Sequence, residues 1–305
     1  MLSHDYDYRS LFETSQRVNW KMEDVIDGKS FDFSRPFLPE ALAGVSGITC
    51  LNDEEKLKLN QIRAFSYLYL FGLVEEYILP SVLDHVRDGG EGEDHEVRAL
   101  LHFAEEEAKH IELFKWFVGE FGRGFGTPRG VIGPSSEIAA AILDHSRLGV
   151  FLTTLHIEWM TQKHYLESVK DNAKENLDPL FCSLLRHHWM EESQHAKLDT
   201  LVVDKIAGTL TSVEVEKGID DYMDIGKFLD GGLQAQVRMD IASLEAATGR
   251  TFSDEEKGEI ERAQVEAYRW TFLLSGMTHP AFDRSLRELS GRGHERVGEL
   301  ARAIA

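Results

Sequence analysis

The sequence predicts an all-α fold: a core of four long helices, additional helices toward the C-terminus, and an irregular strap at the N-terminus. Long stretches of the chain space their apolar residues as helices do, and strand-like alternation never extends beyond a few residues. The seven prolines lie at the edges of these stretches, where they do not interrupt a helix. The motif Glu-Glu-x-x-His occurs twice, in two of the long stretches. Together the three observations indicate a helical bundle.

The four core helices have recognisable starts and stops. Asn52, with the acids that follow it, favours a helix start, and the glycines of 89–92 end that helix. Asp178 followed by Pro179 is typical of the first turn of a helix, and Gly208 is a suitable C-terminal stop. The core helices are expected at about 53–86, 93–121, 136–171 and 178–207.

The remaining segments are expected to pack around this core. The glycine-rich connection 119–134 lacks Gly-Lys-Ser/Thr and follows no strand, so we do not interpret it as a phosphate-binding loop. Further helices are expected at about 212–229, 233–248, 253–277 and 282–302. We expect one domain, in which the strap (1–51) packs on the bundle core (52–208) and the C-terminal helices (209–305) complete it.

The composition excludes several classes of protein. The 305 residues carry a net charge of −20, which disfavours binding to nucleic acid or to an anionic membrane surface. No apolar run reaches the roughly 18 residues that a membrane span needs. The polar N-terminus does not resemble a signal peptide. The two cysteines, Cys50 and Cys182, lie far apart in the sequence and fit a reducing cytoplasm.

Each Glu-x-x-His motif points two metal-binding side chains in one direction. Residues three apart share a helix face, so Glu107 lies beside His110, and Glu192 beside His195. The face of the first pair also carries the apolar residues Leu100, Phe103, Phe114 and Phe117. A carboxylate buried there is costly unless a cation neutralises it. Either motif alone is compatible with a solvated run of charge, but the repetition favours a di-metal carboxylate site.

Such a site needs one more glutamate from each of the other two core helices. In the third helix, Glu158 is an isolated acid on a side that is otherwise apolar. In the first helix, either Glu75 or Glu76 could point inward. Ser66 and Asp84 lie half a turn out of phase with Glu75 and indicate an exposed face opposite it. Glu76 also shares a face with apolar residues, so both glutamates stay candidates.

Three further residues flank the motifs. Glu106 and Glu191 each precede a motif glutamate, and are either exposed acids or acceptors for the remaining imidazole N–H of the histidine on the opposite motif. Their occurrence at both motifs favours the second interpretation. His188 lies one turn before Glu192 on the same face, as a packed core residue or an additional ligand. The other histidines considered, which we interpret as structural, are His102, His145, His156, His164 and His187.

The order of these residues resembles that of a known family. It reads Glu75 (or Glu76), Glu107-x-x-His110, Glu158, His188-x-x-x-Glu192-x-x-His195. Over about residues 53–207 this resembles the ferritin-like non-haem di-iron oxygenases, and the extra histidine is similar to the p-aminobenzoate N-oxygenase family in particular. The resemblance implies a ferritin-like bundle that binds two irons, uses O₂ as co-substrate and oxidises arylamines, with His188 as a metal ligand.

We therefore expect an O₂-activating di-iron oxygenase that acts on a small organic substrate, with N-oxygenation of an arylamine as the specific hypothesis. Carboxylates and imidazoles also suit manganese. The alternatives are another di-metal oxidase (a hydroxylase, a desaturase or a manganese catalase) and a non-enzymatic iron-binding or iron-storage protein. Phe114 occupies the position where ribonucleotide reductase small subunits carry a radical tyrosine, which disfavours that role. The candidate walls of a substrate pocket are Phe71, Phe103, Phe114, Phe151, Trp159 and Trp189.

The expected partners follow from the same interpretation. The sequence contains no flavin or iron–sulfur motif, so an external electron donor or reductase, peroxide or the substrate itself would supply electrons. A homodimer is compatible with the sequence. We expect a cytoplasmic enzyme that binds neither nucleic acid nor membranes.

Overall fold

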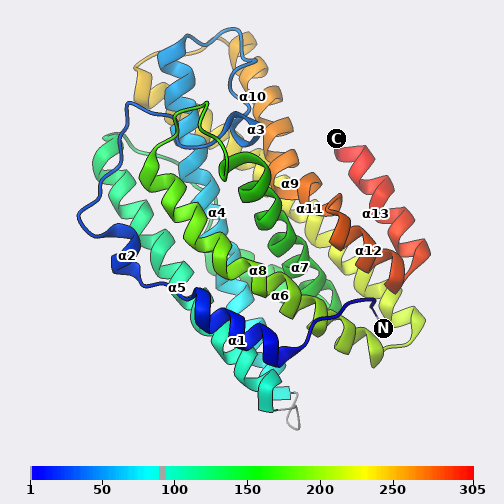
Figure 1. Cartoon of the computed structure of the whole chain (residues 1–305). Coiled ribbons are helices and arrows are strands. Elements are labelled where there is room, and N and C mark those ends of the chain that lie inside the picture. The colour runs from blue at the N-terminus through cyan, green and yellow to red at the C-terminus, as the bar shows by residue number, and fades with distance from the viewer. Residues whose placement is uncertain (1, 89–93) are drawn as a thin grey trace.

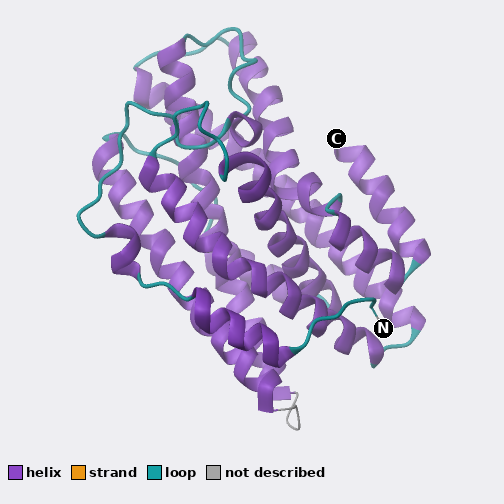
Figure 2. Ribbon diagram, in the orientation of Figure 1, coloured by secondary structure: helices purple, strands orange, loops and turns teal. Residues whose placement is uncertain are grey.

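The computed structural model describes residues 2–88 and 94–305. Within them the chain consists of helices and loops without a strand, which confirms the all-α class (Figure 2). Figure 1 shows four long core helices: α4 (Asp53–Asp88), α5 (Asp94–Phe125), α7 (Arg147–His164) and α8 (Pro179–Gly208). α4 packs against α5, α5 against α8, and α8 against α7. These four helices form the bundle in which the candidate site lies.

Local hydrogen bonds explain where two of these helices begin. The Asn52 side chain accepts from the backbone N–H of Glu55 at 3.0 Å, and the Glu55 carboxylate accepts from the Asn52 N–H at 2.9 Å. Asp178 caps α8 by accepting from the N–H of Phe181 at 2.7 Å. Each cap satisfies backbone donors that the first turn of a helix leaves unpaired.

The third core helix is shorter than expected. The segment predicted as one helix from 136 to 171 is divided into α6 (Ser135–Leu143) and α7, and it ends in a π-helical turn, η1 (Tyr165–Val169). The division occurs because the Ser146 hydroxyl accepts from the N–H of Gly149 and starts a new helix there.

Two C-terminal predictions were wrong in their boundaries. The helices expected at 212–229 and 233–248 form one continuous helix, α9 (Ser212–Thr248), although Gly231 and Gly232 lie within it. α9 packs against α4, α7 and α10 (Asp254–Arg269), and this packing outweighs the roughly 1 kcal/mol that each glycine costs a helix.

The C-terminal segment contains more separate helices than expected. After α10 come a second π-helical turn, η2 (Trp270–Leu274), and α11 (Ser275–Met277). The helix expected at 282–302 is in fact two, α12 (Pro280–Leu289) and α13 (Gly291–Ile304). Ser290 separates them, because its hydroxyl accepts from the N–H of Gly293 and caps α13.

One proline and the N-terminal strap also differ from the expectation. Pro80 lies inside α4 rather than at a helix edge. The strap contains three short helices, α1 (Tyr8–Val18), α2 (Met22–Ile26) and α3 (Glu40–Ala43). α1 and α2 pack on the core helices α5 and α8, which places the strap residue Trp20 beside the candidate site.

Among the residues that the structure describes, no helix is both long enough and apolar enough to cross a bilayer.

Candidate metal centre

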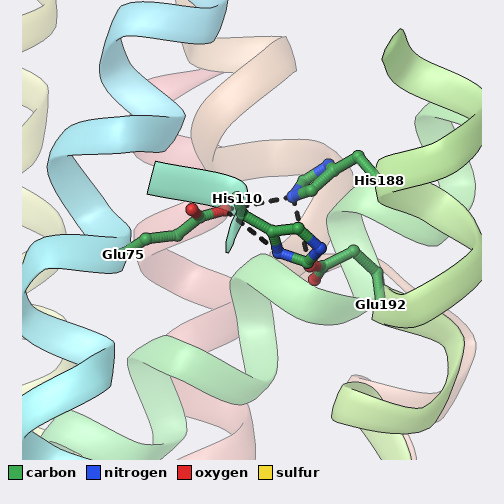
Figure 3. A group of neighbouring side chains, drawn as sticks. All are labelled: Glu75, His110, His188 and Glu192. Atoms are coloured by element: carbon green, nitrogen blue, oxygen red, sulfur yellow. Dashed lines mark hydrogen bonds and ion pairs between the residues drawn. The ribbon is translucent and has the colours of Figure 1, made fainter. Parts of the chain in front are cut away.

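Side chains from α4, α5 and α8 meet in the interior of the bundle. In Figure 3, Glu75, His110, His188 and Glu192 point toward one another. His188 Nε2 lies 3.0 Å from a Glu75 oxygen and 3.1 Å from Glu192 Oε1. His110 Nδ1 also lies 3.1 Å from Glu192 Oε1. All four residues are buried, so the structure gathers two acids and two imidazoles away from solvent.

A second group adjoins the first and shares two of its members. It consists of Glu107, His110, Glu192 and His195, all buried. His195 Nδ1 lies 2.8 Å from Glu107 Oε1 and 3.3 Å from Glu192 Oε1. Because His110 and Glu192 belong to both groups, two ions held here would be neighbours.

The third core helix contributes Glu158, which is buried and shares a hydrogen bond with Glu192. Burial, together with the Glu192 carboxylate, raises the pKa of Glu158 well above its usual range. Its Oε2 atom makes no hydrogen bond. Glu158 therefore reaches the centre from the side of α7.

Of the two candidate glutamates on the first core helix, the structure brings Glu75 into the cluster and leaves Glu76 outside. Glu76 is partly exposed and pairs with Lys115 at 3.6 Å. The reasoning that favoured Glu75 was nevertheless wrong for Ser66. Ser66 is fully buried against α9 and donates a hydrogen bond to Asp240 at 2.8 Å, so it does not lie on an exposed face.

The unpaired atoms of the cluster fit a bound metal. Both Glu107 oxygens, Glu75 Oε2, His110 Nδ1 and His195 Nδ1 are buried and make no hydrogen bond of acceptable geometry. Buried polar atoms are rarely left unpaired, so these atoms need a partner that the protein itself does not supply. Carboxylate oxygens and imidazole nitrogens are the ligands that iron and manganese prefer. The residues present therefore fit two such ions.

The electrostatics of the metal-free cluster show what an ion would replace. Burial and the nearby Glu107 carboxylate raise the pKa of Glu75 to about 8. Burial alone would lower the pKa values of His110 and His195, but the surrounding carboxylates hold both well above the usual range. Protons thus occupy the centre when no cation does, and bound metal would have to displace them.

The outer nitrogen of each motif histidine contacts an acid from the opposite helix. Glu191 Oε2 accepts from His110 Nε2 at 2.9 Å, and Glu106 Oε2 accepts from His195 Nε2 at 3.0 Å. Once a bound ion has displaced the proton on Nδ1, the proton that stays on Nε2 would leave the Nδ1 lone pair facing the cluster. The structure therefore brings Glu106 and Glu191 into hydrogen-bond contact with the outer nitrogens of both histidines.

These acids are themselves held in place. Lys109 Nζ donates to Glu191 at 2.5 Å and to the backbone carbonyl of Trp20 at 3.0 Å. The Trp20 ring stacks on the His110 ring with centroids 6.1 Å apart. On the other side, His102 Nδ1 lies 3.3 Å from Glu106, a contact that the spacing of His102 in the sequence did not indicate. The strap and α5 thus support the two outer acids.

Changing Glu106 to alanine should lower metal affinity or activity roughly 10–100-fold, because the His195 ring would lose the acceptor that orients it. The measurement is a metal-binding titration together with turnover. Glu105→Ala is the matched control, since Glu105 is the adjacent acid and is exposed to solvent. Equal losses in the two variants would show that Glu106 acts only through the general charge of the helix.

Sequence reasoning missed one acid at the centre. Asp199 is fully buried, lies one turn after His195, and has no hydrogen-bond partner on either carboxylate oxygen. Burial raises its pKa well above the usual range, and Glu107 and Glu192 raise it further. The spacing of four residues from His195 was the signal that could have identified it.

One known protein family matches most of this chain. The family model of the p-aminobenzoate N-oxygenase AurF matches residues 7–216. The chain belongs to this family. Members are oxygenases, so the chain is an oxidoreductase, and the match extends from the strap through all four core helices. No curated protein matched the chain.

Solved structures with a related fold are R2-like ligand-binding oxidases. One point mutant with an Fe/Fe cofactor has a TM-score of 0.50 at 16% identity, over 88% of this chain and 93% of that one. Another mutant, with a Mn/Fe cofactor, has a TM-score of 0.49 at 15% identity over the same shares. The first agrees with the expected ferritin-like bundle fold.

Proposed function

We propose that this protein is an O₂-dependent di-metal oxygenase acting on a small organic molecule. One observation carries the proposal: two overlapping, buried groups of carboxylates and imidazoles whose unpaired atoms converge between the core helices. Membership of an oxygenase family supports the same function. When bound, two redox-active ions would supply the binding and reduction of O₂.

Seven residues would hold the ions. They are Glu75, Glu107, His110, Glu158, His188, Glu192 and His195. Six of them form the two overlapping groups, and Glu158 approaches the Glu192 carboxylate from α7. Iron is the proposed metal, with manganese as an alternative, because both accept this mixture of oxygen and nitrogen ligands. The related solved structures hold Fe/Fe or Mn/Fe cofactors, which supports this choice.

The other residues of the centre have roles that need no metal to define them. Glu106 and Glu191 hold the imidazole protons on Nε2, away from the cluster. Phe71 and Phe114 cover His188 with ring centroids 5.5 and 5.1 Å away, which excludes water from that side. A dry centre strengthens the electrostatic interactions that orient its ligands.

The finer parts of the proposal rest on the family. N-oxygenation of an arylamine is the proposed reaction, since the family is named for that activity on p-aminobenzoate. Electrons would come from an external donor or reductase. Both cysteines are free, which is consistent with work in the reducing cytoplasm.

The test is O₂ consumption by the chemically reduced, iron-loaded protein, followed by product analysis with a set of arylamines. We expect rapid O₂ consumption and at least one N-oxygenated product. No O₂ consumption by a chain that holds two irons would refute the oxygenase function. Disproportionation of hydrogen peroxide by a manganese-loaded chain, without O₂ chemistry, would assign it to the catalases instead.

His188→Ala should retain much of the metal, because six ligands remain, yet change the rate of O₂ consumption several-fold or more. His187→Ala is the matched control. His187 lies next in the chain, but its Nδ1 atom contacts the Ser183 carbonyl at 2.7 Å instead of the cluster. Identical O₂ kinetics in wild type and His188→Ala would make His188 a packing residue.

A further inference from the structure

An apolar cavity of about 100 Å³ lies next to the metal centre. Its walls come from α4, α6, α7, α9, η2 and the glycine-rich connection that precedes α6. Every residue that lines it is apolar or glycine. The connection and the C-terminal helices, which the sequence did not link to any function, therefore build part of this wall through Ile132, Gly232 and Phe272.

Phe71 separates the cavity from the centre. It lines the cavity and also contacts the His188 ring edge-on, with centroids 5.5 Å apart. The lining residue Val74 directly precedes Glu75, and Ile157 directly precedes Glu158. Two helices thus present a metal-binding acid to the centre and an adjacent apolar side chain to the cavity. A molecule in the cavity would lie one side chain away from the proposed ligands.

The chemistry of the walls limits what the cavity can hold. A carboxylate placed there would lose its water and find no charged or hydrogen-bonding side chain in exchange, which is strongly unfavourable. Cavities of roughly 150 Å³ with similar walls stay dry and bind a single benzene ring. The cavity here, at about 100 Å³, is smaller than that, so the polarity of its walls, rather than a match in size, favours a small uncharged ring or a short aliphatic chain.

A second hollow, lined mainly by α4 and α5, differs in polarity. It is lined by Phe114, which also contacts His188, and it includes the ion pair of Glu76 and Lys115. A charged substrate would find polar groups there, but not in the apolar cavity. The two hollows therefore predict opposite preferences for a carboxylate-bearing ligand.

We propose that the apolar cavity is the substrate site and that it takes an uncharged, apolar small molecule in preference to a benzoate. The statement that the ligand is a substrate rests on the proposed oxygenase function. The chain would then differ in substrate class from the activity for which its family is named, since p-aminobenzoate carries a carboxylate.

The test compares two arylamines of nearly equal shape, 4-methylaniline and p-aminobenzoate, by calorimetry at neutral pH. The full chain is used with and without Fe(II), without O₂. We expect 4-methylaniline to bind at least about tenfold more tightly, because its methyl group replaces the charged carboxylate. Equal affinity, or tighter binding of p-aminobenzoate, would overturn the proposed preference.

Two adjacent glycines on α9 provide a variant and its control. A Cβ atom on Gly232 would meet the cavity residue Ile132 at 3.4 Å, whereas one on Gly231 would meet nothing within 4 Å. Gly232→Leu should fill the cavity and weaken 4-methylaniline binding at least about tenfold, while Gly231→Leu should not change it. Unchanged binding in a folded Gly232→Leu protein would show that the ligand lies elsewhere.

A gain-of-function variant covers the case in which Gly232→Leu does not fold. Phe228 lines the cavity and is 47% exposed, so a lysine is tolerated there and adds a cation at the rim. Phe228→Lys should strengthen p-aminobenzoate binding several-fold and so reduce the difference in affinity between 4-methylaniline and p-aminobenzoate. No change in the ratio of affinities would contradict a binding mode with the ring in this cavity.

The outcomes separate the cavity from the oxygenase function. Binding that depends on Gly232, in a chain that consumes no O₂, would leave the ligand site in place and refute the proposed function. If the chain consumes O₂ but its ligand binding is unchanged by the Gly232 and Phe228 substitutions, the proposed substrate cavity is refuted and the oxygenase function is not.

Discussion

Glu192→Ala should remove most of the metal from this protein, the largest effect that we expect from a single substitution. Glu192 Oε1 lies within 3.3 Å of a nitrogen of His110, His188 and His195, and the residue belongs to both ligand groups. Its loss therefore opens both sites at once, whereas the loss of Glu75 opens one. Metal analysis after reconstitution and desalting should show a fall from about two ions per chain to a small fraction of that.

Two further variants serve as controls for Glu192→Ala. Glu192→Gln preserves the volume of the side chain and removes only its charge. If Glu192→Gln loses metal as Glu192→Ala does, the missing carboxylate is the cause and not a cavity left by a smaller side chain. Ser193→Ala changes the next residue, which is half-buried and contacts only its own helix turn among the hydrogen bonds described. Full metal content in Glu192→Ala would disprove the ligand assignment.

Stability of the metal-free chain should fall as the pH rises from about 7 to 8, the second large effect. Burial and Glu107 raise the pKa of Glu75 to about 8, and the pKa values of Glu158, His110 and His195 are raised well above their usual ranges. In this window the folded chain therefore holds protons that the unfolded chain has released. Each such proton costs about 1.4 kcal/mol of stability per pH unit as the pH rises.

Histidines with lowered pKa values do not reverse this slope. They are His85, His156, His164 and His279, and burial is the main cause in each. At pH 7 about a quarter of each is still protonated in the unfolded chain, so together they offset roughly one of the protons held by the folded chain, and at pH 8 they offset almost none. The lowered pKa of Glu106, about 2, likewise affects stability only under acidic conditions.

Bound metal should abolish most of this dependence, because cations take the place of the protons and release them on binding. Chemical unfolding of chelator-treated and metal-loaded protein at pH 7 and pH 8 provides the measurement. We expect a loss of at least about 1.4 kcal/mol per pH unit without metal, the value for a single proton, and a much smaller loss with it. A chelated chain that is equally stable at both pH values would contradict the electrostatic description of the centre.

The motif residues could be predicted from the sequence because their geometry is local. A spacing of three places Glu107 beside His110 in any helix, whatever surrounds it. The caps at Asn52 and Asp178 are equally local, and both helices begin where the sequence indicates. Repetition of the motif then indicated a buried cluster rather than a solvated one.

The direction of Glu75 could not be derived in the same way. α4 packs against α5, α6 and α9, so it is covered on several sides and its polar residues do not define one wet face. Ser66 is buried because α9 brings Asp240 to it. A helix enclosed in this way lacks a distinct polar face, so its sequence does not show which side chains point toward the site.

Contacts between distant segments account for the rest of what was missed. His102 and Trp20 reach the centre only because α5 and the strap fold onto it. The cavity combines residues from six segments, and of the aromatic residues expected to form a pocket, Phe71 lines it. Trp159 instead stacks on His279, and Trp189 on Tyr165. Such pairings depend on tertiary packing, which helical periodicity does not encode.

The most direct test of the di-metal centre is a crystal structure of the iron-loaded protein with anomalous diffraction collected above and below the iron edge. We expect two anomalous peaks per chain among Glu75, Glu107, His110, Glu158, His188, Glu192 and His195. Peaks confined to the protein surface, or an empty cluster in a fully reconstituted protein, would contradict it.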